Sequence, residues 1–407
     1  MARSIPLDQQ TIKRQNRRLI LEALQRNGPL SRAELARAVG LTKSTVSSLI
    51  QELLDEQVLY EGALQTAGLG RPGMSLEFHS ERAMALGVEL AVENTTLILL
   101  DLNNQTQGQW EWVESPSTSL SERLHRLAAQ VRVLVQGFEL LLGVGLAVPG
   151  VIKQDRTLVY APNSGPGWRD EHPAEALEAL LGLPVTLDND ANASAFGETF
   201  WGENHSPLLY IMLTTGLGTG LVVDGQVYRG RTGAAGELGH WLIGQQRHHH
   251  PASIVESELS LRSAVNHYQT HSGRSESFRR ILERADGGDR FALETLEYLA
   301  RQLGRFIANV AVTFDPAVVV LGGPGAEAWQ WLEAPLRDTL QKLAFIPEHA
   351  DLPVRPSAFG HIAPATGAAA LVLQRFLANG GTREWSPPIS TLGTRQTVGI
   401  APLRRRM

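Results

Sequence analysis

The chain has 407 residues, of which 43% are hydrophobic and 19% charged, values typical of globular proteins with two or three domains. No run of 18 apolar residues predicts a membrane span, and the polar, basic segment 1–20 lacks the apolar core of a signal peptide, so we expect a cytoplasmic protein. The absence of cysteine excludes disulfide bonds, thiolate nucleophiles and Cys-ligated metals.

The charge is unevenly distributed along the chain, although the net value of −5 is ordinary. Residues 1–50 contain nine Lys or Arg and three Asp or Glu, so this head carries +6 and the remainder carries −11. A basic head on an acidic body is typical of a module that binds a polyanion. A solvated basic helix would produce the same charge, so the order of the predicted elements decides between the two interpretations.

The head begins with two predicted helices. The first spans 10–26 and is stopped by Gly28-Pro29. The second begins at a capping box, in which Ser31 and Glu34 each satisfy a free backbone N–H. It ends before Gly40, the residue type best suited to a left-handed C-terminal turn.

A third helix follows this short turn, with Thr42 as its N-cap. Its apolar residues have helical spacing and predict a buried face of Val46, Leu49, Ile50 and Leu53. The small polar outer face is typical of a recognition helix in the major groove, where such side chains bond to phosphates or base edges. We expect DNA contacts at Lys43, Ser44, Thr45, Ser47, Ser48 and Gln51.

Two short apolar runs at 58–60 and 74–78 flank a loop of Gly, Arg and Pro at 68–73, which predicts the wing of a winged helix-turn-helix. Arg71 in this loop is a candidate for insertion into a narrow minor groove. The alternative is a glycine-rich interdomain linker. The order of helices, tight turn and wing favours a DNA-binding domain over 1–80.

The body, residues 84–378, alternates strand and helix patterns, which predicts an α/β fold. The strand candidates are 85–90, 96–102, 141–148, 185–188, 208–213 and 317–321. The helical patterns cover 119–138, 191–201, 291–314 and 364–376, and 223–226 predicts a tight hairpin turn. The polar, Pro/Gly-containing segment 379–407 predicts a flexible tail.

Polar side chains and glycines gather in five loop segments of the body: 147–150, 161–168, 187–193, 214–220 and 233–240. Carboxylate, amide and imidazole groups on separate loops suit a polyhydroxylated ligand. Asp190 near a ligand hydroxyl is also a candidate general base. Taken by itself, Asp190 stands equally well as the N-cap of the helix that follows it.

These segments resemble the ROK family of repressors and sugar kinases, and in particular its xylose-, N-acetylglucosamine- and glucose-responsive repressors. The matching motifs are GLAVPG at 145–150, APN at 161–163, GW at 167–168, DNDANA at 188–193, GTG at 218–220, DG at 224–225, GELGH at 236–240 and VLGG at 320–323. The resemblance implies a two-lobed actin/hexokinase-like (ribonuclease H-like) domain with a sugar in its cleft. It places sugar contacts at Asn163, Asn189, Asp190, Glu237, His240 and Glu256, with Asp190 at the catalytic base of the family's kinases.

The chain departs from the family's kinases at the loop that holds ATP phosphates. The family pattern Asp-x-Gly-Gly-Thr is replaced here by Glu89-Leu90-Ala91-Val92-Glu93. The flexible glycines are lost and the Glu93 carboxylate would repel phosphate, so neither ATP binding nor kinase activity is expected. We interpret the remaining glycines at 216–220 and 322–323 as inherited architecture.

A second departure concerns the zinc site of the family, which uses a His and three Cys. The Cys positions correspond to Arg247, His249 and Ile254, so no metal is expected. The alternative is a metal bound by His240, His248, His249 and His250, but their spacing enforces no tetrahedral geometry.

The resemblance and the head together predict a sugar-responsive transcriptional repressor. Its partners would be palindromic double-stranded operator DNA and a monosaccharide effector, and it would form a homodimer or homotetramer. Two alternatives remain open: an ATP-dependent sugar kinase with a DNA-binding appendage, and a regulator that has lost sugar sensing and answers to a protein partner.

Overall fold

A computed structural model describes residues 8–65, 73–79, 83–136, 141–161, 164–202, 205–243 and 253–382. The chain forms two compact units. The first contains residues 1–146, 163–187 and 368–407, and the second contains residues 147–162 and 188–367. No helix in the described ranges is long and apolar enough to cross a membrane.

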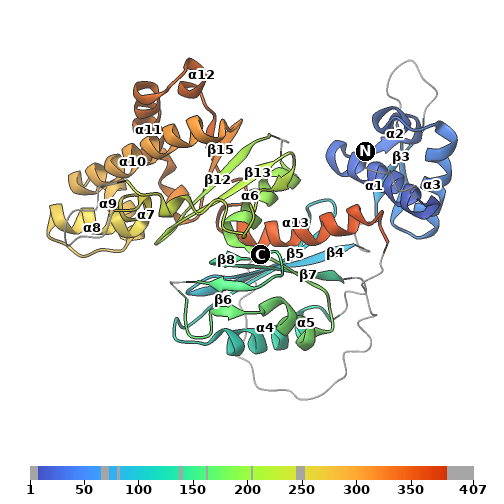
Figure 1. Ribbon diagram of the computed structural model, residues 1–407, viewed down its shortest axis with the longest axis horizontal. Helices are drawn as coiled ribbons and strands as arrows, with labels where there is room; N and C mark the ends of the chain where they lie inside the picture. The colour runs from blue at the N-terminus through green and yellow to red at the C-terminus, as the bar shows by residue number, and fades with distance from the viewer. Residues whose placement is uncertain are drawn as a thin grey trace. The chain divides into compact units, whose positions relative to one another are not determined.

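The head of the first unit is a winged helix-turn-helix (Figure 1). Its elements are α1 (Gln9–Asn27), β1 (Leu30–Ser31), α2 (Arg32–Val39), α3 (Lys43–Asp55), β2 (Leu59–Gln65) and β3 (Gly73–Phe78). The capping box at Ser31, the left-handed Gly40 and the Thr42 cap are confirmed. The predicted apolar face of α3 is buried, with Val46 and Ile50 both fully inaccessible. Strand β1, which the sequence patterns did not predict, pairs with β3.

The body part of the first unit is built on a sheet with the order β11-β7-β4-β5-β6. These strands are β4 (Met84–Leu90), β5 (Asn94–Asp101), β6 (Thr106–Val113), β7 (Leu141–Val148) and β11 (Val185–Asn189), and β10 is Arg169–Glu171. Helices α4 (Leu120–Leu134) and α5 (Pro173–Leu181) pack side by side on one face of the sheet (Figure 1). Helix α4 ends earlier than predicted, and β6 and α5 were not predicted.

The second unit has a sheet with the order β14-β13-β12-β15-β16. These strands are β12 (Leu208–Leu213), β13 (Leu217–Val223), β14 (Gln226–Val227), β15 (Val318–Gly322) and β16 (Val354–Pro356), while β8 (Val151–Ile152) pairs with β9 (Leu158–Tyr160). The helices are α6 (Asp190–Trp201), α7 (Val255–Glu258), α8 (Leu261–Ser272), α9 (Phe278–Asp286), α10 (Arg290–Phe314), α11 (Trp329–Leu343) and α12 (Pro347–Ala350). The apolar faces of α7 to α11, together with β12, β13 and β15, form one continuous core. The hairpin turn at 223–226 is confirmed, with Asp224 and Gly225 both at positive φ.

Helix α13 (Ala363–Ala378) belongs to both units, because the boundary between them falls after Gly367. Its residues from Ala363 to Phe376 are buried apart from two positions. Ala368, on this helix, packs against β7: a Cβ at Gly145 would lie 1.9 Å from the Ala368 carbonyl oxygen. Glycine at 145 is therefore required for β7 and α13 to lie this close.

Candidate functional site

The candidate effector site of the second unit begins at the junction of β11 and α6. Asn189 is the N-cap of α6: its side-chain oxygen accepts from the backbone N–H of Ala191 (2.9 Å) and Asn192 (3.1 Å). Its side-chain nitrogen donates to the Gly150 carbonyl (3.0 Å). Asn189 thus holds the strand-to-helix turn in place. The interpretation of Asp190 as the cap is wrong, because Asp190 is the first residue of the helix proper.

Because Asn189 is the N-cap of α6, the Asp190 side chain does not cap the helix. Its side chain is half-buried, and one oxygen accepts from the Ala191 N–H at 2.8 Å. Burial, reinforced by the negative charge of Glu237, raises the pKa of Asp190 to about 7. A carboxyl group with this pKa can accept a hydrogen bond from a ligand hydroxyl when ionised and donate one when protonated.

Glu237 and His240 lie together at a short 3-10 helix, Leu238–His240, which follows the positive-φ residue Gly236. Burial raises the pKa of Glu237, the positive charge of His240 lowers it, and the charge of Glu256 raises it. His240 itself is exposed. Because the charges of His240 and Glu256 both act on Glu237, these three predicted sugar contacts lie close enough to interact electrostatically.

Glu256, on α7, is fixed against the start of β13. Its carboxylate accepts from the Leu217 N–H at 3.0 Å, and a Cβ at Gly216 would lie 2.7 Å from the same carboxylate oxygen. Glu256 also lies close to the turn that carries His240, since a Cβ at Gly239 would lie 3.6 Å from the Glu256 Cβ. Five predicted contacts, Asn189, Asp190, Glu237, His240 and Glu256, are thus brought together within one unit from separate elements.

The glycines of β13 are needed for packing. The sequence patterns placed 214–220 in a turn, but a strand begins at Leu217. A Cβ at Gly220 would lie 2.4 Å from the Ala191 carbonyl oxygen, and one at Gly218 would lie 3.3 Å from the Ala191 Cβ. Helix α6 therefore approaches β13 as closely as these glycines permit. A Cβ at Gly322 would likewise overlap the Tyr210 hydroxyl. This packing supports the interpretation of both glycine segments as architecture.

An ion pair that sequence reasoning missed lies directly behind the site. Asp188 is buried, and its carboxylate accepts from Arg229 and from the backbone N–H of Asn189. Burial raises the pKa of Asp188, and Arg229 opposes that shift. The pair stabilises the end of β11, from which Asn189 and Asp190 project. Its two members lie 41 positions apart, so no local pattern could have found it.

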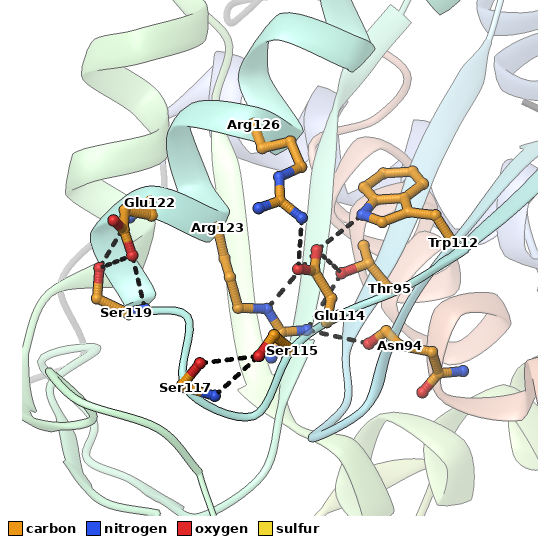
Figure 2. Close-up of polar contacts among 10 residues, drawn as sticks. All are labelled: Asn94, Thr95, Trp112, Glu114, Ser115, Ser117, Ser119, Glu122, Arg123 and Arg126. Carbon is orange, nitrogen blue, oxygen red and sulfur yellow. Dashed lines mark hydrogen bonds and ion pairs between the residues drawn. The ribbon is translucent and has the colours of Figure 1, made fainter. Parts of the chain in front are cut away.

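The turn between β4 and β5, where the family's kinases hold phosphate, is held in the first unit by a buried ionic network (Figure 2). Glu114 accepts from the Thr95 hydroxyl (3.0 Å), the Trp112 indole (2.7 Å) and Arg126 (2.8 Å). Its N–H donates to the Glu93 carbonyl at 2.7 Å. The turn is therefore engaged by the chain's own side chains and backbone.

Arg123 connects this network to the loop that follows Asn163. Its guanidinium donates to the Asn94 carbonyl (3.0 Å) and the Thr95 hydroxyl (3.1 Å), and it lies over the Trp168 ring, 5.4 Å from the centroid. Burial lowers the pKa of Arg123, whereas Glu114 and Glu89 raise it. Its charge thus offsets that of Glu114, with which it forms an ion pair at 3.9 Å.

The recognition helix α3 presents the predicted polar face. Of the six residues expected to contact DNA, Lys43, Ser44, Ser47, Ser48 and Gln51 are exposed. Thr45 is half-buried, and its hydroxyl bonds to that of Thr42 at 2.8 Å. The outer face of α3 is accordingly open, with Thr45 at its margin.

Several predicted residues lie outside the described ranges: Arg71 in the wing, Asn163, and His248, His249 and His250. Within the described ranges, no group of three or more His, Asp or Glu side chains could hold a metal ion. Ile254, at one of the family's Cys positions, forms a bridge with Leu242 and offers no ligand atom. The residues described here therefore do not fit the family's zinc site.

Comparison with known proteins shows where this combination of domains occurs. Residues 85–375 match the ROK family, and residues 13–59 match a winged helix-turn-helix DNA-binding family. The chain belongs to the ROK family. Its ROK domain has the actin/hexokinase-like fold, preceded by the winged helix-turn-helix.

Relatives and solved structures show the same architecture. The chain is 30% identical to the xylose repressor of Bacillus subtilis over 382 residues, covering 91% of this chain and 98% of the relative. It is 24% identical to the DNA-binding transcriptional dual regulator NagC of Escherichia coli, covering 91% and 94%. A ROK transcriptional regulator homologous to E. coli MLC superposes with a TM-score of 0.77 at 23% identity, covering 91% and 98%.

The ROK kinases share only the body. A Streptomyces griseus ROK glucokinase, crystallised with glucose and AMPPNP, is 26% identical, with a TM-score of 0.63 over 71% of this chain and 98% of the glucokinase. The difference in coverage shows that the winged head separates this chain from the kinase.

Proposed function

We propose that this ROK protein is a repressor that binds a palindromic operator through its head and releases it when a monosaccharide occupies the second unit. The observation that carries the proposal is the group of Asp190, Glu237, His240 and Glu256 on one unit of a chain whose head exposes a polar recognition helix. The vicinal hydroxyls of a sugar can donate hydrogen bonds to these carboxylates, and the His240 imidazole can donate or accept a further hydrogen bond.

In this proposal, sugar binding and operator binding are linked equilibria. A sugar that binds one arrangement of the units more tightly shifts the population toward it, and the reverse effect of DNA on the sugar is equally large. Palindromic operators require two heads at a defined spacing, so the protein would act as a homodimer or homotetramer.

The test of sugar sensing is a thermal-shift screen of the full chain against monosaccharides, amino sugars and their phosphates, with and without ATP. We expect one sugar to raise the unfolding temperature independently of ATP, since ligand binding to the native state stabilises it. Asp190→Asn should abolish the shift, and the matched control Asp224→Asn, at an exposed turn, should retain it. A chain that responds to none of these compounds would refute sugar sensing.

The test of DNA binding uses Lys43, the exposed cation at the start of α3. Lys43→Ala should weaken operator binding and reduce the salt slope by about 1, because one phosphate contact is lost. Lys342, which pairs with Asp338 on α11, supplies the control Lys342→Ala. Equal salt slopes for the two variants would contradict a phosphate contact at Lys43.

A sugar kinase is the second candidate, because the fold is shared with a ROK glucokinase. Two observations favour a sensor without nucleotide chemistry: Glu93 is exposed on the turn after β4, and Glu114 and Arg123 bond to the backbone carbonyls of Glu93 and Asn94. We infer that neither ATP nor zinc is a cofactor. A coupled assay for ADP release with the stabilising sugar tests the inference about ATP, and turnover would favour the kinase.

A further inference from the structure

Helix α13 runs continuously from the unit that carries the candidate effector site into the unit that carries the head. Gly367 is its last residue in the second unit, and Gly380 follows its C-terminal end by two residues. A helix of this kind transmits displacement along its axis without an intervening loop.

The first end of α13 contacts α6 backbone to backbone. A Cβ at Gly367 would lie 1.7 Å from the Ala193 carbonyl oxygen, and one at Gly197 would lie 3.0 Å from the Gly367 Cα. Ala193 is in the first turn of α6, three residues after Asp190. Because the two backbones are in direct contact, displacement of the first turn of α6 displaces Gly367 as well.

The other end of α13 is attached to the head. The Gly381 N–H donates to the Phe376 carbonyl (3.0 Å), which closes the helix with Gly380 and Gly381 both at positive φ. Arg17 of α1, only 4% exposed, donates through Nε to the Gly380 carbonyl at 2.8 Å. The same guanidinium pairs with Glu56, at the C-terminal end of α3, at 2.7 Å.

Gly381 meets the apolar core of the head. A Cβ on it would approach side-chain carbons of Leu21 (3.0 Å), Val58 (3.3 Å) and Leu53 (3.5 Å), which come from α1, the approach to β2, and α3. The glycine turn at the end of α13 thus lies against Leu53 of the recognition helix. It is also linked to Glu56, at the end of that helix, because Arg17 bonds to both Gly380 and Glu56. A charged, buried donor and a fitted glycine turn make this a specific attachment.

We propose that α13 is the coupling rod of this regulator, joining the effector site through Gly367 to the recognition helix through Gly380, Gly381 and Arg17. This inference rests on the proposed sugar sensing for its physiological input. Occupancy of the site shifts the first turn of α6, Gly367 follows, and the glycine turn moves α1 and α3 together. Arg17 is a positioning residue, since it contacts neither sugar nor DNA in this mechanism.

The test is the double variant Gly380→Ala/Gly381→Ala in the full chain, with Gly273→Ala/Gly288→Ala as control. The φ values match, at 70° and 76° for the first pair and 70° and 78° for the second, so the backbone strain is equal. A Cβ at Gly380 would lie 3.1 Å from the Arg14 carbonyl, whereas a Cβ at Gly273 or Gly288 meets nothing within 4 Å. The two double variants therefore differ in contact with the head.

The first readout is the ratio of operator dissociation constants with and without the stabilising sugar. We expect a ratio of about 5 to 150 for the wild type and the control, and a ratio within about twofold of 1 for the Gly380/Gly381 variant. That variant should still bind sugar and still bind the operator without sugar. A wild-type ratio in the variant would overturn the proposal. Loss of its operator binding would also overturn it, because the glycine turn would then be part of the head's own fold.

The second readout needs no sugar and separates this inference from the proposed function. Operator DNA should slow amide hydrogen exchange in α6 and α13 of the wild type, because coupling is reciprocal, and should leave both unchanged in the variant. Equal slowing in both proteins, or none in the wild type, would overturn the coupling rod. A chain that binds no sugar but shows the expected exchange pattern would refute sugar sensing and retain the rod.

Discussion

Glu114 in the first unit and Asp190 in the second are both carboxylates shielded from solvent, but their neighbours differ in charge. Glu114 accepts from Thr95, Trp112 and Arg126 (Figure 2). Asp190 is shielded beside the negative charge of Glu237, and its pKa rises to about 7. Neutralised carboxylates stabilise the fold, whereas a carboxylate with a raised pKa destabilises the ligand-free protein and is available for a ligand.

The largest expected effect is that of Glu114→Gln. Removing one partner of a buried ion pair leaves Arg123, which is 3% exposed, without this compensation, so we expect a loss of about 3–5 kcal/mol in the first unit. Local unfolding free energies from amide exchange measure this loss for each unit separately. Glu111→Gln, exposed on the same hairpin and bonded to Asn94, should change little. Equal losses in the two variants would remove the contrast between Glu114 and Asp190.

Asp190→Asn should stabilise the second unit in a pH-dependent manner. The folded pKa of about 7 exceeds the ordinary value of 3.8, so the unfolding free energy of the wild type falls as pH rises from about 4 to about 7 and is level above. Asn does not titrate, so the advantage of the variant should grow over that window. Because Asp190 is partly accessible, we expect it to reach the order of 2 kcal/mol. An advantage independent of pH would contradict the raised pKa.

Glu237→Gln should have a smaller effect of the same sign. The pKa of Glu237 is raised by burial and by Glu256, while His240 lowers it, so removing the charge relieves part of the repulsion in the ligand-free protein. We expect a gain in the second unit smaller than that of Asp190→Asn near pH 8, together with about 10- to 100-fold weaker sugar binding from the lost charged hydrogen bond. Amide exchange and titration calorimetry measure the two effects, and a destabilised ligand-free variant would contradict this assignment.

Arg126→Ala should have the smallest effect. The Arg126 side chain is 46% exposed, although its partner Glu114 is 1% exposed, so solvent screens much of the pair. We expect a loss below about 1 kcal/mol in the first unit. Arg123→Met, at the buried cation, should cost several times more. If the two arginines proved equivalent in thermal and exchange measurements, burial would not be what distinguishes them.

The head was predictable nearly to the residue because its signals are local. A capping box spans four residues, a left-handed glycine is one residue, and the apolar face of α3 repeats within a single helix. The wing was predicted from its flanking strands, which are confirmed, while Arg71 remains a prediction. Strand β1 was missed because two residues at 30–31 carry no periodic pattern and exist as a strand only by pairing with β3.

In the body, the candidate sugar contacts could be predicted from the sequence, whereas the arginines that bond to distant residues could not. Five of the six residues for which the family resemblance implied sugar contacts lie in the second unit. Arg229, Arg123 and Arg17 were not predicted, since each acts on a residue between 28 and 363 positions away. The glycines of β13 were placed in a turn because glycine indicates loops in a sequence, whereas here Gly220 allows contact with α6.

Local patterns and motifs thus determined the class of this protein: a capped helix-turn-helix head, an α/β body of the ROK family, and the acidic residues of its candidate site. Tertiary structure decided which carboxylates are neutralised and which keep a raised pKa, because burial and distant charges set those values. It also decided that α13 reaches Arg17 through Gly380. Spacing along the chain cannot specify that contact, since the two residues are 363 positions apart and only the packing of the elements between them brings them together.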